Sequence, residues 1–444
     1  MTGLPRHTER VRALLAGVPA WAAAHPDVAG VGLAGSWAAA RARDDSDVDL
    51  VILTPRRRAL ADDRAWLADL APGADVVRRQ DWGPHLTEVR VVLPGGLELE
   101  VGLADLAWAS TDPVDAGTAR VVGDGFVVLH DPDGLLAALS SGVSRRPPAD
   151  VEVTADLARR LLAAQHPDLA GLPLRHADGG WDNEVWRLGP ELAVRMPRRE
   201  IAAGLLENED RWLPVLARLV DLPVPEPVRL GRPGAGYPYP WAVVRWVPGE
   251  PAWRVPVAAR TPWAPHLADV LVDLHRPADP AAPPNPFRAV PLAERDVVVR
   301  QRLVPPLDGE VTGLAHLDRL WEDALAADPW TGPPLWVHGD PHPANLLADP
   351  ARPDRLAGLV DFGDLTAGDP ACDLATAWLT FDSDGRAAFR TRLLERGALD
   401  DATWRRARGW AVAMGLAMVR RPGDPAIGSI GRHAVGQLLD EPLP

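Results

Sequence analysis

The segment His338–Asn345 (HGDPHPAN) is the most informative part of this chain, together with Asp361–Asp364 (DFGD), which begins sixteen residues after Asn345. The apolar run Leu335–Val337 leads into the first motif, and Leu356–Val360 leads into the second. Both motifs are therefore expected where strands end. Transfer of a phosphoryl group needs a carboxylate beside the attacking hydroxyl and oxygen ligands for the magnesium that bridges the phosphates.

The spacing of the polar residues suits that chemistry. Asp340 precedes Asn345 by five residues on a tight loop, so one side chain can face a substrate and the other a metal ion. Asp361, at the end of the following strand, completes the metal site. Each motif alone is also typical of a turn rich in Asp, Asn and Pro. Two such turns with these acids in this order, each after an apolar run, favour the catalytic interpretation.

These motifs resemble those of the aminoglycoside phosphotransferase family, which has the protein-kinase-like fold. The resemblance runs from about residue 148 to about residue 436 and includes Gly180–Asn183 (GWDN), Ala193–Arg198 (AVRMPR) and Asp361–Asp373 (DFGDLTAGDPACD). It implies that Asp340 is the catalytic base and that Asn345 and Asp361 bind Mg²⁺. It also implies that His338 supports the loop, and that Asp369 and Asp373 hold the helical lobe together and do not contact substrate.

One position departs from the family. Members with protein-kinase-like chemistry usually carry a lysine on the strand that holds the α- and β-phosphates, and Arg195 stands at the matching place. Arginine keeps the charge and can donate to two oxygens, but it is bulkier. Its expected partner is a carboxylate on the next helix; Glu209 is preferred and Glu207 is the alternative. A surface arginine beside a solvated glutamate is the competing interpretation.

Further nucleotide contacts are expected at a glycine turn and at a hinge strand. A Gly-Gly pair ends at Gly180, where backbone N–H groups can approach phosphate. A plain hairpin turn is the alternative. Asn183 is assigned to the same nucleotide loop. The strand Val243–Val247 is expected to read adenine with its backbone, which places Arg245 and Val247 at the nucleotide.

A second set of candidate metal ligands lies near the N-terminus. Asp47 and Asp49 open an apolar strand that ends at Leu53. Alternation along a strand puts both carboxylates on the same side, where they repel unless a cation lies between them. A divalent metal is the natural occupant. Glu100 is the preferred third carboxylate, and Glu98 is the alternative.

Gly35 and Ser36, at the end of the preceding strand, can offer backbone and hydroxyl donors to triphosphate oxygens. With the acids, they resemble the nucleotidyltransferase superfamily, specifically the type that includes antibiotic adenylyltransferases, over about residues 8–139. The pattern departs from that family at Ala40, where glycine is frequent, and Trp37 follows Ser36 directly. The alternative is that Asp44–Asp49 (DDSDVD) is a polar turn and helix cap.

The chain is expected to form two domains of α/β and α+β class. Residues 1–143 are expected to be a nucleotidyltransferase-like mixed sheet with helices, followed by a linker at 144–150 (SRRPPAD). Residues 151–444 are expected to form a bilobal protein-kinase-like fold. Its small sheet lobe is placed at about 151–248 and its mostly helical lobe at about 249–444.

Periodicity and turn residues predict individual elements. Helices are expected at 8–24, 59–70, 151–164, 202–219 and 265–275, with Pro214 kinking or dividing the fourth. Strands are expected at 28–34, 48–53, 184–188, 191–196 and 241–247, and a hairpin at 88–103. Residues from 305 onward are expected to be mostly helical, interrupted between Trp336 and Asp373.

The composition is that of a globular protein, with 47% hydrophobic and 24% charged residues. The net charge of −14 disfavours nucleic acid and anionic membranes as partners. One cysteine, Cys372, excludes an internal disulfide framework, and lysine is absent. Arg10–Ala24 mimics a secretory signal, but Pro19 and Trp21 interrupt it, so a packed helix and a cytoplasmic location are expected.

Together these patterns predict an O-phosphotransferase that uses ATP (or GTP) and Mg²⁺ on a small hydroxylated molecule. An aminoglycoside antibiotic is the leading acceptor, which would make the protein an antibiotic-resistance enzyme. A fused, active nucleotidyltransferase domain would make it bifunctional. Another metabolite or a macrolide as acceptor, and a regulatory nucleotidyltransferase that modifies a protein partner, are the alternatives. The sequence does not indicate an oligomeric state.

Overall fold

The computed structural model describes residues 7–143, 149–179, 182–303, 313–419 and 424–443. Two compact units make up the chain. Unit 1 comprises Met1–Arg145, Ala293–Glu322 and Val412–Pro444, and unit 2 comprises Arg146–Leu292 and Asp323–Ala411. The domain boundaries expected from the sequence stay a prediction, and most of the expected linker lies outside the described residues.

A six-stranded mixed sheet forms the centre of the N-terminal part of unit 1, in the order β3-β4-β5-β2-β1-β6. The strands are β1 (Gly30–Ala34), β2 (Val48–Leu53), β3 (Asp75–Asp81), β4 (Leu86–Val92), β5 (Glu98–Ala104) and β6 (Phe126–His130). β2 and β5 are parallel, and the other neighbours are antiparallel. This register puts Asp49 between Ala34 on β1 and Glu100 on β5.

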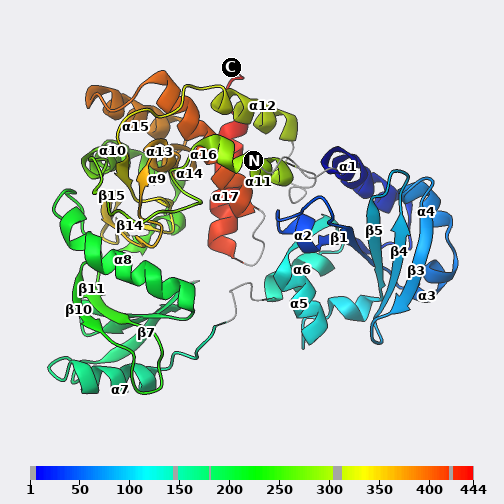
Figure 1. Cartoon of the computed structure of the whole chain (residues 1–444), viewed down its shortest axis with the longest axis horizontal. Coiled ribbons are helices and arrows are strands. Elements are labelled where there is room, and N and C mark those ends of the chain that lie inside the picture. The colour runs from blue at the N-terminus through cyan, green and yellow to red at the C-terminus, as the bar shows by residue number, and fades with distance from the viewer. Residues whose placement is uncertain (1–6, 144–148, 180–181, 304–312, 420–423, 444) are drawn as a thin grey trace. The chain divides into compact units, whose positions relative to one another are not determined.

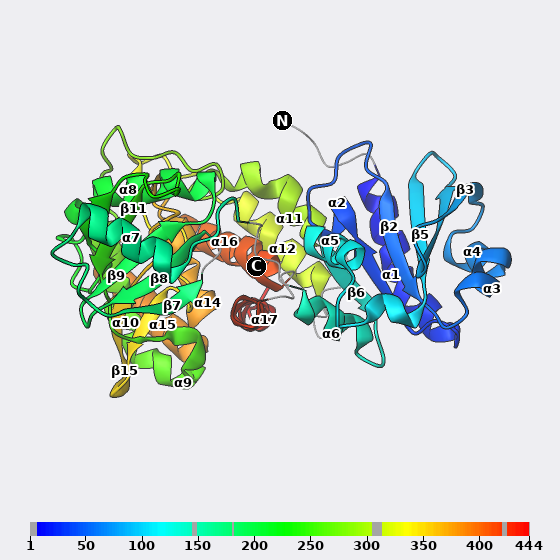
Figure 2. The same cartoon turned by 90° about the horizontal axis from the view of Figure 1, so that it is seen from below.

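Helices cover both faces of this sheet (Figures 1 and 2). They are α1 (Thr8–Ala24), α2 (Gly35–Ala38), α3 (Arg57–Asp62), α4 (Ala65–Leu70), α5 (Ala116–Asp124) and α6 (Leu135–Gly142). Alternation along β2 divides the core, because Leu50 and Ile52 pack with α1 and α4. Val51 and Leu53 pack on the opposite face with α5 and α6. Asp49 shares the second face, since side chains two residues apart point the same way.

Unit 1 also holds helices from later in the chain. They are α11 (Asp296–Arg302) and α17 (Pro425–Leu439), while α12 (Leu314–Leu325) and α16 (Asp401–Val419) have residues in both units. Within the part of the chain that the structure describes, no helix has the length and apolar character needed to span a bilayer.

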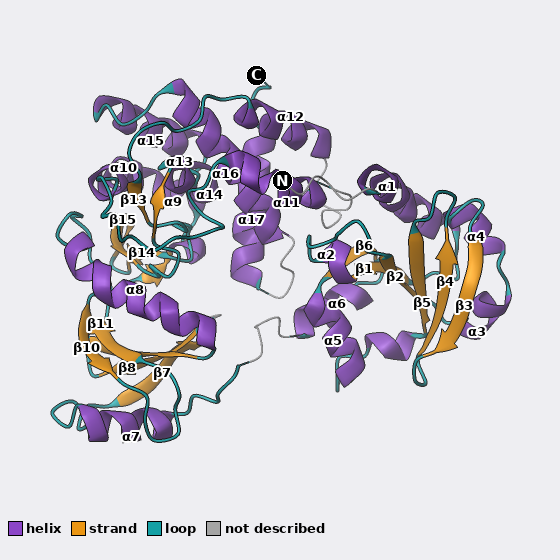
Figure 3. Cartoon of the chain, in the orientation of Figure 1, coloured by secondary structure: helices purple, strands orange, loops and turns teal. Residues whose placement is uncertain are grey.

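Unit 2 begins with a five-stranded antiparallel sheet in the order β10-β11-β9-β8-β7. Its strands are β7 (Leu174–Gly179), β8 (Asn183–Leu188), β9 (Leu192–Pro197), β10 (Pro227–Gly231) and β11 (Trp241–Arg245). Helices α7 (Ala155–Gln165) and α8 (Glu200–Leu216) lie on opposite faces (Figure 3). Val194 and Met196 pack with α7, and Ala193 packs with α8. Arg195 therefore points toward α8.

The rest of unit 2 is mostly helical, with two small sheets that carry the motif loops. The small strands are β12 (Glu250–Pro251), β13 (Leu335–Val337), β14 (Leu346–Asp349), β15 (Arg352–Leu359) and β16 (Thr366–Gly368). The helices are α9 (Val257–Arg260), α10 (Ala264–Leu274), α13 (Ala371–Leu374), α14 (Thr376–Thr380) and α15 (Ser383–Glu395). The predicted succession of a sheet lobe and a helical lobe is thus confirmed for this part of the chain.

Several predicted boundaries are wrong. The helix expected at 59–70 is two helices, α3 and α4, because Asp63 Oδ1 accepts from the N–H of Ala65 at 3.0 Å and starts α4 afresh. Pro214 does not divide α8, which continues through it to Leu216. The hinge strand β11 ends at Arg245, two residues early. Several strands were not predicted: β3, a mostly exposed edge strand rich in charge, and also β6, β7, β10, β12, β14 and β16.

Candidate active site

The loop His338–Asn345 follows β13 and is anchored by one buried carboxylate. Asp373 is fully buried and accepts from the N–H groups of His338 and Gly339, both at 2.8 Å. His275 Nε2 lies 3.0 Å from the same carboxylate. Gly339 has φ +91°, and a Cβ there would lie 2.5 Å from the carbonyl oxygen of Asp364, so glycine is required. Asp373 therefore fixes the backbone immediately before Asp340.

His338 joins this loop to the second motif. Its Nε2 lies 3.2 Å from the carbonyl oxygen of Val360, and its Nδ1 accepts from the N–H of Asp340 at 3.2 Å. These two contacts assign the proton to Nε2. The imidazole also packs on Phe362, with ring centroids 4.5 Å apart. His338 thus supports the loop in the way that the family resemblance implies.

The structure brings Asp340, Asn345 and Asp361 into one region. Asn345 Nδ2 donates to the carbonyl oxygen of Asp340 at 3.0 Å, which leaves its side-chain oxygen for another ligand. The Asn345 carbonyl accepts from the N–H of Val360 at 2.9 Å, so Asp361 follows directly. Asp361 is exposed and has φ +62°, an unfavourable left-handed conformation for a residue with a Cβ. Such strain is typical of functional sites.

Arg195 forms a buried, two-pronged ion pair with Glu209 of α8, the partner preferred from the sequence. Arg195 Nη1 contacts Glu209 Oε2, and Nη2 donates to Oε1 at 3.1 Å. The two residues are only 8% and 4% exposed, which rules out a solvated surface pair. A Cβ on Gly363 would lie 3.3 Å from Asp361 Oδ1 and 3.7 Å from Glu209 Oε1, so the ion pair lies near the proposed metal ligand Asp361.

Asp340 sits between two positively polarised groups. Its Oδ1 lies 3.3 Å from Arg288 Nη2, and its Oδ2 lies 3.3 Å from His342 Nε2. Burial alone would raise the pKa of Asp340, but His342 and Arg288 outweigh burial and hold that pKa well below its ordinary value. Asp340 is therefore ionised at neutral pH.

Arg288 and Asp364 were not singled out from the sequence. Arg288 lies in a proline-rich segment without a recognisable motif, and its Nη2 also lies 3.1 Å from Asp364 Oδ2. Asp364 in turn accepts from Asn285 Nδ2 at 3.0 Å. The DFGD motif drew attention to Asp361 alone, although its second aspartate is equally part of the site.

The structure gives less information on the residues that were predicted to contact the nucleotide. Gly180 lies outside the described residues. Asn183 opens β8, and its Oδ1 is buried without a hydrogen-bond partner. Arg245 is exposed at the end of β11, and Val247 is buried beyond it. Their contact with a nucleotide stays a prediction.

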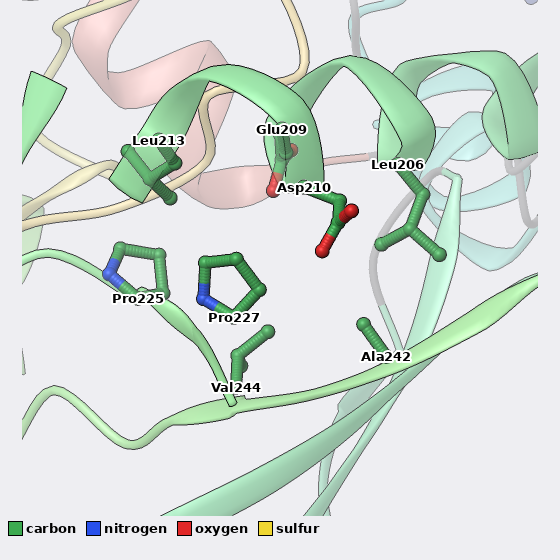
Figure 4. Close-up of a pocket in the computed structure, with 8 residues that line it drawn as sticks. All are labelled: Leu206, Glu209, Asp210, Leu213, Pro225, Pro227, Ala242 and Val244. Carbon is green, nitrogen blue, oxygen red and sulfur yellow. The ribbon is translucent and has the colours of Figure 1, made fainter. Parts of the chain in front are cut away.

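A small pocket lies between α8 and strands β10 and β11 (Figure 4). Its lining is mostly apolar and consists of Leu206, Glu209, Asp210, Leu213, Pro225, Pro227, Ala242 and Val244. The Asp210 carboxylate points between the helix and the strand in Figure 4, and partial burial raises its pKa. Because Glu209 itself lines this pocket, the contacts between α8 and the two strands help to position the Glu209 side chain.

Two further buried side chains, Asp369 and Cys372, lie in the helical part of unit 2. Asp369 accepts from Arg406 Nε at 2.7 Å, a buried pair that ties β16 to α16. The Cys372 thiol is fully buried, with Sγ 3.8 Å from the carbonyl oxygen of Gly339. Burial raises its pKa well above the ordinary value.

In unit 1, the structure brings the three predicted carboxylates together. One oxygen from each of Asp47, Asp49 and Glu100 lies within 4.8 Å of the others. Burial, and then the charge of Asp47, raise the pKa of Asp49 to about 7. Three carboxylates this close together repel one another, so the cluster favours binding of a proton or a cation.

The surroundings of these carboxylates include Gly35, Ser36 and Arg90. Gly35 has φ +67°, and a Cβ there would collide with Asp49 Oδ2, so a side chain is excluded. Ser36 Oγ is buried without a hydrogen-bond partner. Arg90, on β4, contacts Glu100 through Nη2 and was not identified from the sequence. It is the only cation that an ion pair links to this trio among the described residues.

Comparison with known proteins gives a family match and several solved structures that align with part of the chain. The profile of the phosphotransferase enzyme family matches residues 173–410, more than half of the chain. Wild-type aminoglycoside 2'-phosphotransferase-IIIa, solved with GDP, is 22% identical, with TM-score 0.47, over 63% of this chain and 97% of that one. Macrolide 2'-phosphotransferase MphH from Brachybacterium faecium is 23% identical, with TM-score 0.42, over 64% and 98%. No curated protein matches the sequence.

Proposed function

The chain belongs to the phosphotransferase enzyme family, and on this basis we propose that it transfers the γ-phosphoryl group of ATP or GTP to a hydroxyl group of a small molecule. The observation that carries the proposal is the convergence of Asp340, Asn345 and Asp361 beside the buried Arg195–Glu209 pair. Phosphoryl transfer depends mainly on positioning and on charge stabilisation, and these residues provide both.

Asp340 would act on the acceptor. Because its carboxylate is ionised and has a low pKa, it accepts a hydrogen bond from the substrate hydroxyl and orients its oxygen. A strong base is not required, since little proton transfer is needed before the phosphoryl group leaves in a loose transition state. Asp340 takes the proton late, when the hydroxyl has become acidic.

Asn345 and Asp361 fit a magnesium ion as ligands. Asn345 is held through its Nδ2, so only its side-chain oxygen is left, and Asp361 presents an exposed carboxylate from a strained backbone. Magnesium typically uses one or two such oxygens plus phosphate oxygens. When bound, the ion neutralises charge on the transferred phosphates. Arg195, held by Glu209, has N–H groups left to donate to the α- or β-phosphate.

We place the acceptor among aminoglycosides first, as the sequence resemblance implies, with macrolides, amino alcohols and sugars as alternatives. The acidic chain suits a cationic acceptor, but Arg288 already occupies the space between Asp340 and Asp364. A substrate ammonium group is therefore not needed to neutralise those two acids. This feature keeps neutral macrolides and sugars in the assay panel.

The test is a transfer assay with the purified chain, MgCl₂, ATP or GTP and a panel of these compound classes. ADP or GDP release and mass spectrometry of the acceptor would report the gain of one phosphate. We expect Asp340→Asn to lose at least about 100-fold in kcat. The matched control is Asp354→Asn, an exposed aspartate on β15. Absence of phosphate transfer to every class, or full activity of Asp340→Asn, would contradict the proposal.

A second candidate function belongs to unit 1. The trio of Asp47, Asp49 and Glu100 beside Gly35 and Ser36 supports nucleotidyl transfer that depends on a divalent cation. The same reactions test it, because the acceptor would then gain a nucleotide instead of a phosphate. Asp49→Asn should abolish this product and spare phosphorylation. If the nucleotide appears on a protein partner instead, the regulatory alternative replaces antibiotic modification.

A further inference from the structure

Arg288 reaches the candidate active site from a proline-rich segment that lies outside the two sequence motifs, His338–Asn345 and Asp361–Asp364. Its Nη2 lies 3.3 Å from Asp340 Oδ1 and 3.1 Å from Asp364 Oδ2, so one nitrogen bridges two carboxylates. The side chain is 22% exposed, and its Nε is buried without a hydrogen-bond partner. Without a cation between them, the two carboxylates would repel each other.

Three hydrogen bonds fix the segment that carries Arg288, residues 283–289, to residues 364–369. Thr366 Oγ1 donates to the carbonyl oxygen of Pro283 at 2.9 Å. Asn285 Nδ2 donates to Asp364 Oδ1 at 3.0 Å. The N–H of Asp369 donates to the carbonyl oxygen of Ala289 at 3.1 Å. These bonds fix the position of the segment beside Asp364.

The backbone beside Arg288 is itself constrained. Ala289 is buried and has φ +55°, an unfavourable conformation for alanine. Gly368 faces it so closely that a Cβ would collide with the Ala289 carbonyl oxygen. Packing therefore holds Ala289 in this conformation and directs the preceding side chain toward Asp340.

We propose that Arg288 is a positioning residue for phosphoryl transfer, which fixes the Asp340 carboxylate in the orientation that receives the acceptor hydroxyl. The proposal rests on the proposed function. Arg288 forms an ion pair with one Asp340 oxygen, His342 forms an ion pair with the other, and Asp364 forms a second ion pair with the Arg288 guanidinium. The carboxylate cannot rotate without breaking one of these contacts, and a displacement of about 1 Å at a reacting group costs about 100-fold in rate.

The test compares R288A, R288K and a matched control in the full chain. With ATP and the aminoglycoside or macrolide that wild type phosphorylates fastest, R288A should lose about 100-fold in kcat, while the KM for ATP changes little. R288K should keep most of the activity, because a single nitrogen makes both contacts. Guanidinium ion added to R288A should restore activity. R405A, which breaks the Arg405–Asp323 pair elsewhere in unit 2, should retain wild-type kcat.

The outcomes separate this proposal from the proposed function. If wild type phosphorylates no compound, the proposed function fails. If wild type is active and R288A matches R405A in kcat, the positioning role is overturned. It is also overturned if R288A is slow but neither guanidinium nor R288K raises kcat, because a folding defect then explains the loss. A double-mutant cycle of R288A and D340N, measured by thermal stability, tests the Arg288–Asp340 contact without an activity assay. If the two losses of stability are additive, the contact is refuted.

Discussion

Replacing Asp373 is predicted to loosen the catalytic loop and to lower the stability of unit 2. Its carboxylate accepts two backbone N–H groups at 2.8 Å and lies 3.0 Å from His275 Nε2, all in a fully buried place. Each hydrogen bond to a charged group contributes about 1.5–3 kcal/mol. Asp373→Ala removes both backbone bonds, so we expect a loss of about 3–6 kcal/mol. Asp373→Asn keeps one acceptor oxygen and should cost about half as much.

Differential scanning fluorimetry and urea denaturation would measure these losses. In a unit of this size, 1 kcal/mol shifts Tm by about 2–4 °C, so Asp373→Asn should melt roughly 5–10 °C lower. Asp349→Asn is the matched control, because Asp349 also accepts two backbone N–H groups, at 2.9 and 3.3 Å, but on an exposed turn. Water replaces its bonds, so Tm should fall by less than about 2 °C.

The same variant tests the connection to catalysis. Asp340 follows the two anchored residues directly, so Asp373→Asn should reduce kcat more than it raises the KM for ATP. An Asp373→Asn protein with the Tm and the kcat of the Asp349→Asn control would refute the reasoning. Loss of both stability and kcat, with Asp349→Asn unaffected, would support it.

Three other perturbations have defined outcomes. Arg195→Met leaves Glu209 buried and unpaired and should cost about 3–5 kcal/mol in urea denaturation; adding Glu209→Leu should recover stability but not ATP turnover. Because burial raises the pKa of Asp49 to about 7, protons compete with metal below that pH, so calorimetric Mn²⁺ affinity should fall about tenfold per pH unit below 7. A fall that persists in Asp49→Asn would contradict this assignment. Burial raises the pKa of Asp323, but hydrogen bonds from two arginines outweigh burial and lower that pKa overall. The Asp323 carboxylate therefore stabilises the fold above the unfolded pKa of about 3.9, and this stabilisation is lost as the pH falls through the lower folded pKa. The urea midpoints of Asp323→Asn and wild type should differ at pH 7 and become equal at acidic pH.

The sequence was most informative where a motif coincided with a strand end. The strand at Leu335–Val337 has the predicted bounds, and the loop after it holds Asp340 and Asn345 together through a hydrogen bond from Asn345 Nδ2 to the Asp340 carbonyl oxygen. The Arg195–Glu209 pair was also predictable, because alternation on β9 and helical spacing on α8 fix which side chains face each other.

Contacts made by irregular segments could not be predicted in this way. Arg288 is separated from Asp340 by more than fifty residues and lies in a proline-rich stretch with no period that would orient its side chain. Arg90 was missed for a related reason: strand β4 was recognised, but its register against β5 decides that Arg90 lies opposite Glu100. Such pairings depend on tertiary register, which local patterns do not specify.

The buried thiol of Cys372 has a practical consequence. It is the one cysteine of the chain, and it touches the backbone of the catalytic loop at Gly339. A thiol reagent in the surrounding solution can reach it only when this region opens locally, so the labelling rate measures how often that happens. The rate at which Cys372 is labelled therefore reports local opening of the active site, and nucleotide binding should slow this labelling.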